Sequence, residues 1–374
     1  MRRIIGMMFQ LYGETGVTQI LGWVLVFAGL IIMNEIGRRT KFGGILVFAI
    51  IPLVLTAYFI AIQIGAHTGA AWALGTQTYM YMNGWFHYAK LYAADIGCVG
   101  FMMLKYRWGI GAKEWFKPWP FVIVGINILI AVGSDIESAV KGFMAGGLAG
   151  GWWASNEGVF LYGGWWNIVN AIAGLINIMC MTGWWGIYSS KKDKDMLWPD
   201  MTVWFIVAYD VWNFEYTYCN LPTHTWYCGV ALLLAPTFAN ALWNKGGWIQ
   251  NRANTLAIWC MFAQVVPMFQ LSDTFSVLPV VYGGAQKHGV TAHQMYKAAM
   301  DVYNTHGDAA AEIAKFGIKA NPTMQGVWAL LALAANVICI SVIIKRSIEQ
   351  HKNPYTNEIF AGTKDYEEAM ARRA

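Results

Sequence analysis

The sequence predicts an all-α fold: a polytopic integral membrane helix bundle of about nine transmembrane helices, with one external helical loop. Composition is the first reason, because 57% of the 374 residues are hydrophobic and only 13% are charged, whereas soluble domains contain about 25% charged residues. The mean hydropathy of +0.40 agrees with this. The second reason is that apolar runs long enough to cross about 30 Å of hydrocarbon recur along the chain.

The amino-terminal segment is basic at Arg2 and Arg3, and its apolar run ends at Gln10. Such a run is shorter than the apolar core of a signal peptide. We therefore expect residues 2–12 to form a short amphipathic helix that lies in the membrane interface.

The apolar runs that follow define a single transmembrane domain, residues 1–352, which precedes a polar tail at residues 353–374. Each run is long enough to cross the hydrocarbon layer as a helix. The expected spans lie at about 17–36, 43–65, 85–105, 119–137, 160–188, 198–218, 226–243, 253–271 and 325–344.

Basic residues gather in the connections that follow every second span. This set comprises Arg38, Arg39, Lys41, Lys105, Arg107, Lys113, Lys117, Lys191, Lys192, Lys194, Lys245, Arg252, Lys345, Arg346 and Lys352. The positive-inside rule places these connections in the cytoplasm. We therefore expect a multi-pass protein of the cell membrane, of the bacterial inner-membrane type, with a cytoplasmic carboxyl tail and an external amino terminus.

Three connections on the other side are long. Residues 66–84 should lie outside the membrane, and the glycine-rich segment 138–157, a poor helix former, should pack externally or as a re-entrant segment. In residues 272–323, apolar residues recur at helical spacing after Thr291, and Gln294 follows at the position of a first-turn cap. We expect one or two external helices there, the alternative being a mobile loop.

Polar side chains inside the third span identify candidate functional residues. At 100° per residue, Tyr88, Tyr92 and Asp95 share one face of this helix, with His87 at its flank. Lys90 is the only lysine well inside a span. Ionisable groups in a membrane are costly, so a chain that retains them gives them partners or a water-filled cavity.

The sixth span and the turn after it carry a second group of polar residues, and the opposite direction of this span brings the two groups to a similar depth. Two helices that bear carboxylates would then meet in the outer half of the bilayer. Candidate acid, base and electrostatic residues are Glu215, Asp210, His87, Asp95 and Lys90. Candidate substrate-binding residues are Tyr88, Tyr92, Trp212, Asn213, Tyr216, Tyr218, His224, Asn167 and Asn170.

Structural explanations compete with this functional interpretation. Lys90 with a carboxylate could be a buried ion pair that fixes helix register. Asn167, Asn170, Gly174 and Asn177 share one face of the fifth span, which is also typical of close helix packing in membranes.

Cys219 and Cys228 bracket a turn that contains Pro222 and His224, and a disulfide could join them if that side is oxidising. The spacing of Cys219, His224 and Cys228 matches no familiar zinc pattern, so we expect no metal. The sequence lacks nucleotide-binding glycine loops and metalloprotease motifs, and no motif indicates a cofactor, which stays unknown.

The composition favours membrane lipids and a lipophilic small molecule or small solute as partners, and the modest net charge of +5 excludes nucleic acid. The leading hypothesis is a membrane-embedded enzyme that uses acid/base residues in an outer-half pocket on a lipid or lipophilic small molecule, such as an isomerase, hydrolase or transferase. The alternative is a proton-coupled transporter or channel for a small solute. The third is an accessory membrane subunit or receptor, with residues 272–323 as the surface for a protein partner.

Overall fold

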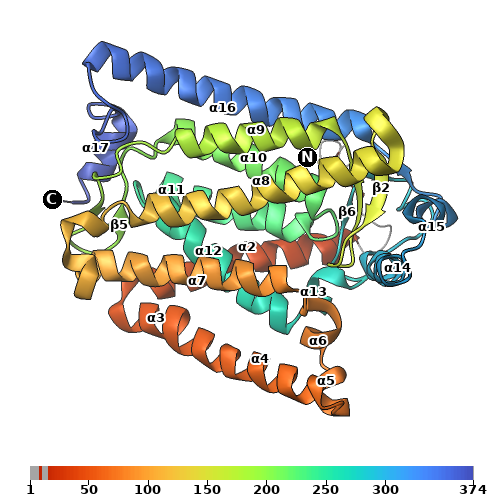
Figure 1. Cartoon of the computed structure of the whole chain (residues 1–374). Helices are drawn as coiled ribbons and strands as arrows, with labels where there is room; N and C mark the ends of the chain where they lie inside the picture. Colours follow the sequence, from red (N-terminus) through yellow and green to blue (C-terminus); the bar gives the residue numbers. More distant parts are fainter. Residues whose placement is uncertain (1–7, 11–15, 374) are drawn as a thin grey trace.

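The computed structural model describes residues 8–10 and 16–373, and these are mostly helical (Figure 1). Strands occur only as four two-stranded ribbons within the described residues, so the all-α prediction is confirmed. Four helical stretches are long and apolar enough to cross a membrane: α2 (Gly16–Arg39), the stretch Lys41–His67, the stretch Glu114–Ala149 and α16 (Pro322–Gln350). Lys41–His67 contains α3 (Lys41–Ile45), the π-helical turn η1 (Leu46–Ile50) and α4 (Ile51–His67), and Glu114–Ala149 contains α8 (Trp119–Gly146).

The other five expected spans also contain helices, which are shorter or more polar. These are α7 (Trp85–Tyr106), α9 (Trp165–Met179), α10 (Val203–Asn220), the stretch Trp226–Leu242 made of η5 and α11, and α12 (Trp248–Val265), which α13 (Met268–Leu271) follows. The 15 residues of α9 span only about 22 Å at 1.5 Å per residue, less than the hydrocarbon layer. The polar residues of α7, α10 and α12 face the interior of the bundle, where they form the sites described below.

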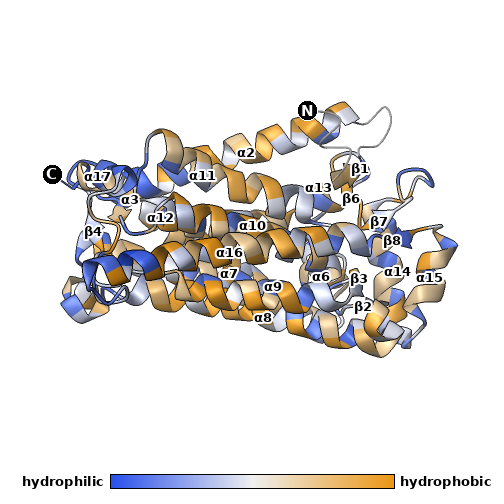
Figure 2. Cartoon of the chain, turned by 90° about the horizontal axis from the view of Figure 1, so that it is seen from above, coloured by the Kyte–Doolittle hydropathy of each residue, from blue (hydrophilic) through white to orange (hydrophobic). Residues whose placement is uncertain are grey.

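The long helices lie side by side along one direction (Figure 1). α9, α10 and α16 pack against one another, and α7 packs against both α8 and α12. α2 and α11 cover the far side of α12. Hydrophobic residues predominate along the helices, and hydrophilic residues gather at the two ends of the bundle (Figure 2). We call these ends the α14 end and the α17 end, after the short helices found there.

At the α14 end, the segment at Phe9 is a strand and not an interfacial helix. β1 (Phe9–Gln10) pairs antiparallel with β6 (Leu278–Pro279). Phe9 is buried in edge-to-face contact with Trp226, and the Gln10 amide donates to the carbonyl oxygen of Tyr282 at 2.7 Å. The helix predicted at residues 2–12 is therefore wrong at Phe9 and Gln10, and the rest of that range lies outside the described residues apart from Met8.

The glycine-rich segment after α8 forms a hairpin. α8 continues to Gly146, the single turn η4 (Gly147–Ala149) follows, and β2 (Gly151–Ala154) pairs with β3 (Phe160–Gly163). Glycine is required where the hairpin meets α8, because a side chain at Gly142 would overlap the backbone of Gly163. Close approach of the two backbones therefore explains a glycine at this position.

Helices are present in two of the segments that were expected to lie outside the membrane. α5 (Ala71–Leu74) and α6 (Gln77–Met82) lie within 66–84, and α14 (Ala292–Thr305) and α15 (Ala309–Lys315) lie within 272–323. The predicted cap is confirmed, because Thr291 and Gln294 form a reciprocal capping box. The ribbon of β7 (Tyr282–Gly283) and β8 (Lys319–Ala320) closes the segment at its base. Ala292, Met295 and Ala299 are buried, so α14 is packed against its neighbours.

At the α17 end, the polar tail packs back onto the bundle. It contains α17 (Lys364–Met370), and its residues Ile359 and Phe360 are buried. The Asp200 carboxylate accepts from the backbone N–H groups of both residues, at 3.3 and 2.9 Å. Thr182 donates a third hydrogen bond to Asp200 at 2.5 Å. Short connections complete this end: η2 (Gly109–Ala112), η3 (Glu114–Phe116) and the ribbon of β4 (Tyr188–Ser189) with β5 (Met196–Leu197).

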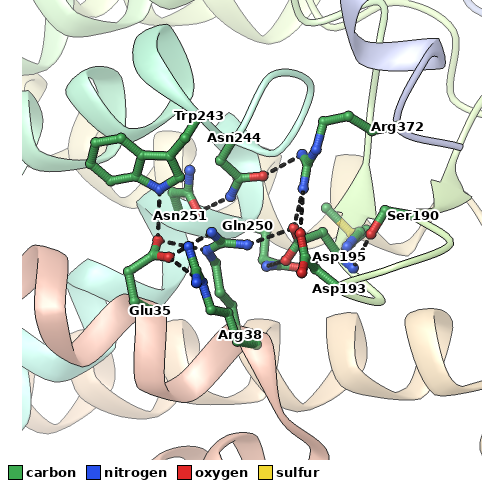
Figure 3. Close-up of polar contacts among 12 residues, drawn as sticks. Glu35, Arg38, Ser190, Asp193, Asp195, Trp243, Asn244, Gln250, Asn251 and Arg372 are labelled. Carbon is green, nitrogen blue, oxygen red and sulfur yellow. Dashed lines mark hydrogen bonds and ion pairs between the residues drawn. The ribbon is translucent and has the colours of Figure 1, made fainter.

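A second buried carboxylate, Asp195, joins four parts of the chain at this end (Figure 3). Arg38 of α2 donates to Asp195 at 2.6 Å, and Gln250 of α12 donates at 3.0 Å. Arg372 of the tail donates to the same carboxylate and to Asn244. This Asp195 network therefore connects α2, the β4–β5 loop, α12 and the tail.

Candidate functional site

A cavity of about 120 Å³ lies between α7, α8, α10 and α12. The π-helical turn η5 (Trp226–Ala231) also contributes to its wall through Cys228. Such wide turns are frequent at functional sites. The space can hold several water molecules or one small organic molecule.

Six of the candidate residues from the sequence line this central cavity: His87, Lys90, Trp212, Asn213, Tyr216 and His224. Helical geometry explains the wall that α10 provides, because Tyr209, Trp212, Asn213 and Tyr216 are three or four residues apart and share a face. The Trp212 indole N–H donates to the backbone oxygen of Asn170 at 3.2 Å, which fixes the ring against α9.

Arg252 is the main lining residue that the sequence interpretation missed. The sequence places Arg252 in a basic connection, because the apolar run that predicts the span begins at residue 253. The helix begins at Trp248, about one turn earlier, and Arg252 lies inside it with only 8% of its surface exposed. The polar run around Asn251 and Asn254, also buried, was the available signal.

The two cations of the cavity are held by aromatic rings. The Lys90 ammonium lies 5.4 Å from the centre of the Phe86 ring and 5.7 Å from that of Tyr216. The Arg252 guanidinium lies 5.7 Å from the centre of the Tyr209 ring. Within the described residues neither cation forms an ion pair with a carboxylate, so the structural alternative of a buried Lys90–carboxylate pair is not observed.

The other candidates on α7 face away from the cavity. Tyr92 and Thr56 of α4 share a hydrogen bond of 2.8 Å, and the Tyr88 ring packs edge-on against Phe59 of α4. Asp95 is absent from the cavity wall. The predicted shared face of Tyr88 and Tyr92 is thus present, but it meets α4 and not α10.

Asp210 also lies outside the cavity wall and is bonded to α11. Its carboxylate accepts a hydrogen bond of 2.6 Å from Thr237, which in turn accepts one of 2.9 Å from the Trp248 indole. Asp210 and Arg252 interact electrostatically, although they form no direct ion pair.

Glu215, Asn167 and Asn170 belong to a separate buried cluster around Asp135 of α8. The Asp135 carboxylate accepts hydrogen bonds from Asn220 at 2.5 Å, Asn170 at 2.8 Å and Asn167 at 3.3 Å. Glu215 is fully buried and interacts electrostatically with Asp135. The two asparagines therefore donate to a buried carboxylate of a neighbouring helix, an arrangement that agrees with the packing alternative.

Tyr218 and the cysteine pair complete the set of candidates. The Tyr218 hydroxyl donates to the backbone oxygen of Met8 at 2.8 Å and does not reach the cavity. Cys219 lies near Gln325 of α16, whereas Cys228 lines the cavity, and both are free thiols. The disulfide considered for Cys219 and Cys228 is therefore not formed.

A more polar cavity of about 200 Å³ lies beside the first one, toward the α14 end. We call it the vestibule; Glu137, Lys141 and Glu157 are its charged lining residues. Phe86 and Leu221 line both cavities. At this boundary His87 Nδ1 lies 2.7 Å from Glu157 Oε2, an ion pair when the imidazole is protonated.

A small cavity of about 40 Å³ continues from the central one toward the α17 end. The two share Asn127, Tyr209, Arg252 and Leu256. This inner cavity is lined farther along by Phe101 and Trp248. The three cavities thus follow one another along α7, from the vestibule to the aromatic side chains near the α17 end.

Comparison with curated proteins and with solved structures gives no match. A family model matches residues 13–372, nearly the whole chain, including every residue of the three cavities. The chain therefore belongs to this family, which is described as a family of unknown function, DUF5692.

Proposed function

We propose that this chain is a multi-pass membrane carrier that moves a small organic solute through the series of three cavities. The nine helical stretches of the bundle would be its spans, with α9 and the stretch of η5 and α11 as the shortest. A helix that carries polar side chains crosses a membrane only when neighbouring helices cover those side chains. The polar side chains of α7, α10 and α12 point toward the interior of the bundle.

The distribution of basic residues supports an orientation for this carrier. Arg38, Lys105, Lys192, Lys245 and Arg346 all lie at or near the α17 end of their helices or in its connections. By the positive-inside rule, the α17 end and the tail would be cytoplasmic and the α14 end external.

The continuity of the three cavities is the observation that carries the proposal. A site for catalysis alone needs one opening, whereas a carrier needs a path along the membrane normal. The vestibule, central cavity and inner cavity share lining residues in sequence, and they run parallel to α7.

The closed end of the path supports a carrier that is shut on the cytoplasmic side. Aromatic side chains pack against one another at the wall of the inner cavity, where Trp248 and Tyr209, both lining residues, form edge-to-face or tilted contacts with each other and with Phe205. The Asp195 network lies at the same end of the bundle (Figure 3). A carrier that alternates between two states would have to separate these contacts in its other state.

Transport is tested with purified protein reconstituted into liposomes. The vesicles are incubated with an extract of small metabolites, washed, and their contents are identified by mass spectrometry. A carrier enriches at least one solute above protein-free liposomes, and Trp212→Ala, which alters the cavity wall, reduces that enrichment. If no solute enters while the same protein converts an extract component in detergent, transport is wrong.

A membrane-embedded enzyme is the second candidate, and one observation favours it. His87 lines the central cavity while a carboxylate, Glu157, lies against its Nδ1 atom, an arrangement that supports a general base. Acid/base chemistry would then use His87 and His224, since Glu215, Asp210 and Asp95 lie elsewhere. Conversion of a lipid or metabolite extract in detergent, lost in His87→Gln, supports this candidate.

A further inference from the structure

The central cavity carries more positive than negative charge. Lys90 and Arg252 both line it, and in Arg252 the Nε and Nη1 atoms are buried and lack a hydrogen-bond partner. The third nitrogen, Nη2, donates to the Asn213 side chain at 3.3 Å. A buried guanidinium with unused donors is costly unless something accepts from it.

The nearest acids do not remove this excess. Asp210 interacts with Arg252 but directs its hydrogen-bonded oxygen at Thr237. Even with Asp210 ionised, one positive charge of the two cations remains unbalanced. Glu157 is occupied by His87 at the boundary with the vestibule.

Apolar and aromatic side chains form much of the remaining wall, beside neutral polar groups such as Asn127 and Gln264. The apolar and aromatic lining residues include Phe86, Trp212, Tyr216, Trp259 and Leu232. Of these, Phe86 and Tyr216 have rings near the Lys90 ammonium. Flat rings and aliphatic groups favour a ligand with an apolar body, while a few placed polar groups select its charged end. The two features together define an amphiphilic ligand.

We propose that the central cavity binds a small organic anion, with its acidic group between Lys90 and Arg252 and its apolar body against the aromatic wall. This rests on the proposed function, since it names the class of solute that the carrier would take. Arg252 offers charged N–H donors at Nε and Nη1 to a carboxylate or sulfonate, and Lys90 adds a second charge.

The alternative is that the two cations only stabilise the fold through their ring contacts. The two explanations predict opposite effects on the ligand-free protein. A cation held for a ligand destabilises the empty fold, so its removal leaves the melting temperature unchanged or raises it. A structural cation stabilises the fold, so its removal lowers the melting temperature.

Binding is measured with the full-length protein in detergent, by melting temperature and by calorimetry. One set of probes is benzoate, benzamide and benzamidine, which are alike in shape but anionic, neutral and cationic; hexanoate, hexanol and hexylamine form a second set. We expect benzoate or hexanoate to raise the melting temperature above its neutral and cationic analogues. The proposal is overturned if the neutral or cationic compounds bind as well as the anions, or if no anion binds.

Variants then assign the site. Lys90→Met and Arg252→Met should each weaken anion binding by about tenfold or more, the expected loss for a charge-assisted hydrogen bond. The exposed Lys345, at the end of α16, provides the control Lys345→Met, which should change nothing. Unchanged affinity in both cavity variants, or a lower melting temperature of both without ligand, contradicts the proposal. If a variant does not fold, the analogue series on the unmodified protein still decides.

These outcomes separate the anion site from the carrier. Binding in detergent needs no transport, so anion binding without vesicle uptake supports the site and contradicts the carrier. Uptake of neutral or cationic solutes, with no anion bound, supports the carrier and contradicts the site.

Discussion

Arg252 of α12 donates a hydrogen bond to Asn213 of α10 at 3.3 Å in the wall of the central cavity. The amide is neutral, so this contact orients the guanidinium without balancing its charge. The Arg252 side chain is thereby fixed with two nitrogens unused.

Asn213→Asp should place a carboxylate next to Arg252 and stabilise the empty fold by about 1.5–3 kcal/mol, the range for hydrogen bonds to charged groups. The same change should abolish anion binding, because the added carboxylate occupies the donors and repels a second anion. Melting temperature and calorimetry with benzoate check both effects. Asn213→Ala is the control, and equal behaviour of the two variants would contradict the role given to charge.

Asp195→Asn should destabilise the fold by about 3–5 kcal/mol, because it leaves Arg38 and Arg372 without their shared carboxylate in a buried site. Asp193 provides a matched control, since it lies 3.7 Å from Arg372 and is partly exposed. Asp193→Asn should cost less than about 1 kcal/mol. Unfolding in detergent measures the free energy of unfolding of both variants. Equal losses in the two variants would show that the Asp195 network contributes no more to stability than a surface ion pair.

The stability of the α17 end should depend on pH through Asp200, which lies in the connection before α10. Burial raises the pKa of Asp200 to about 6, despite the hydrogen bonds that lower it from Thr182, Phe360 and Ile359. Between about pH 4 and pH 6 the folded state holds the proton more tightly than the unfolded state. Stability therefore falls as the pH rises through this window and is constant above it.

The expected size of this fall is about 3 kcal/mol, from a shift of about two pKa units. Unfolding of the protein and of Asp200→Asn, compared from pH 4 to pH 7, isolates the contribution, since all other groups titrate in both. The difference between the two curves should change through the window. A difference that is constant with pH would contradict the assignment to Asp200.

Gly84→Ala should loosen the boundary between the vestibule and the central cavity. A methyl group at Gly84 would overlap the Glu157 carboxylate and push it away from His87. A loss of about 1.4 kcal/mol of interaction between His87 and Glu157 corresponds to about a tenfold increase in the population in which the boundary between the two cavities is open. We expect faster reaction of Cys228 with a water-soluble thiol reagent applied at the α14 side.

Gly133→Ala is the control for this change, because Gly133 lies in α8 with open space where its side chain would be. It should leave the reaction rate of Cys228 unaltered. If both variants behave alike, the His87–Glu157 pair does not limit access to the cavity.

The positions of the helices could be predicted from the sequence because the membrane requirement is a property of composition. Every expected apolar range contains a helix, and the cap at Thr291 follows from local chemistry. The strand at Phe9 could not be predicted this way. It depends on pairing with Leu278, far away in the sequence.

The site was predictable only in part, because helical periodicity shows which residues share a face but not which neighbour that face meets. His87 and Lys90 face the cavity, whereas Tyr88 and Tyr92 meet α4. Glu215, on the sixth span like Asn213, faces the Asp135 cluster. These differences are set by tertiary packing.

The most direct test of the carrier uses a thiol that is already in the cavity. Cys228 is kept and the other cysteines are replaced by alanine, and the protein is reconstituted in one orientation. A membrane-impermeant thiol reagent is then applied from either side. If the protein is a carrier, Cys228 reacts from both sides of the membrane, and benzoate changes both reaction rates. Reaction from the α14 side alone, with and without benzoate, would contradict the carrier.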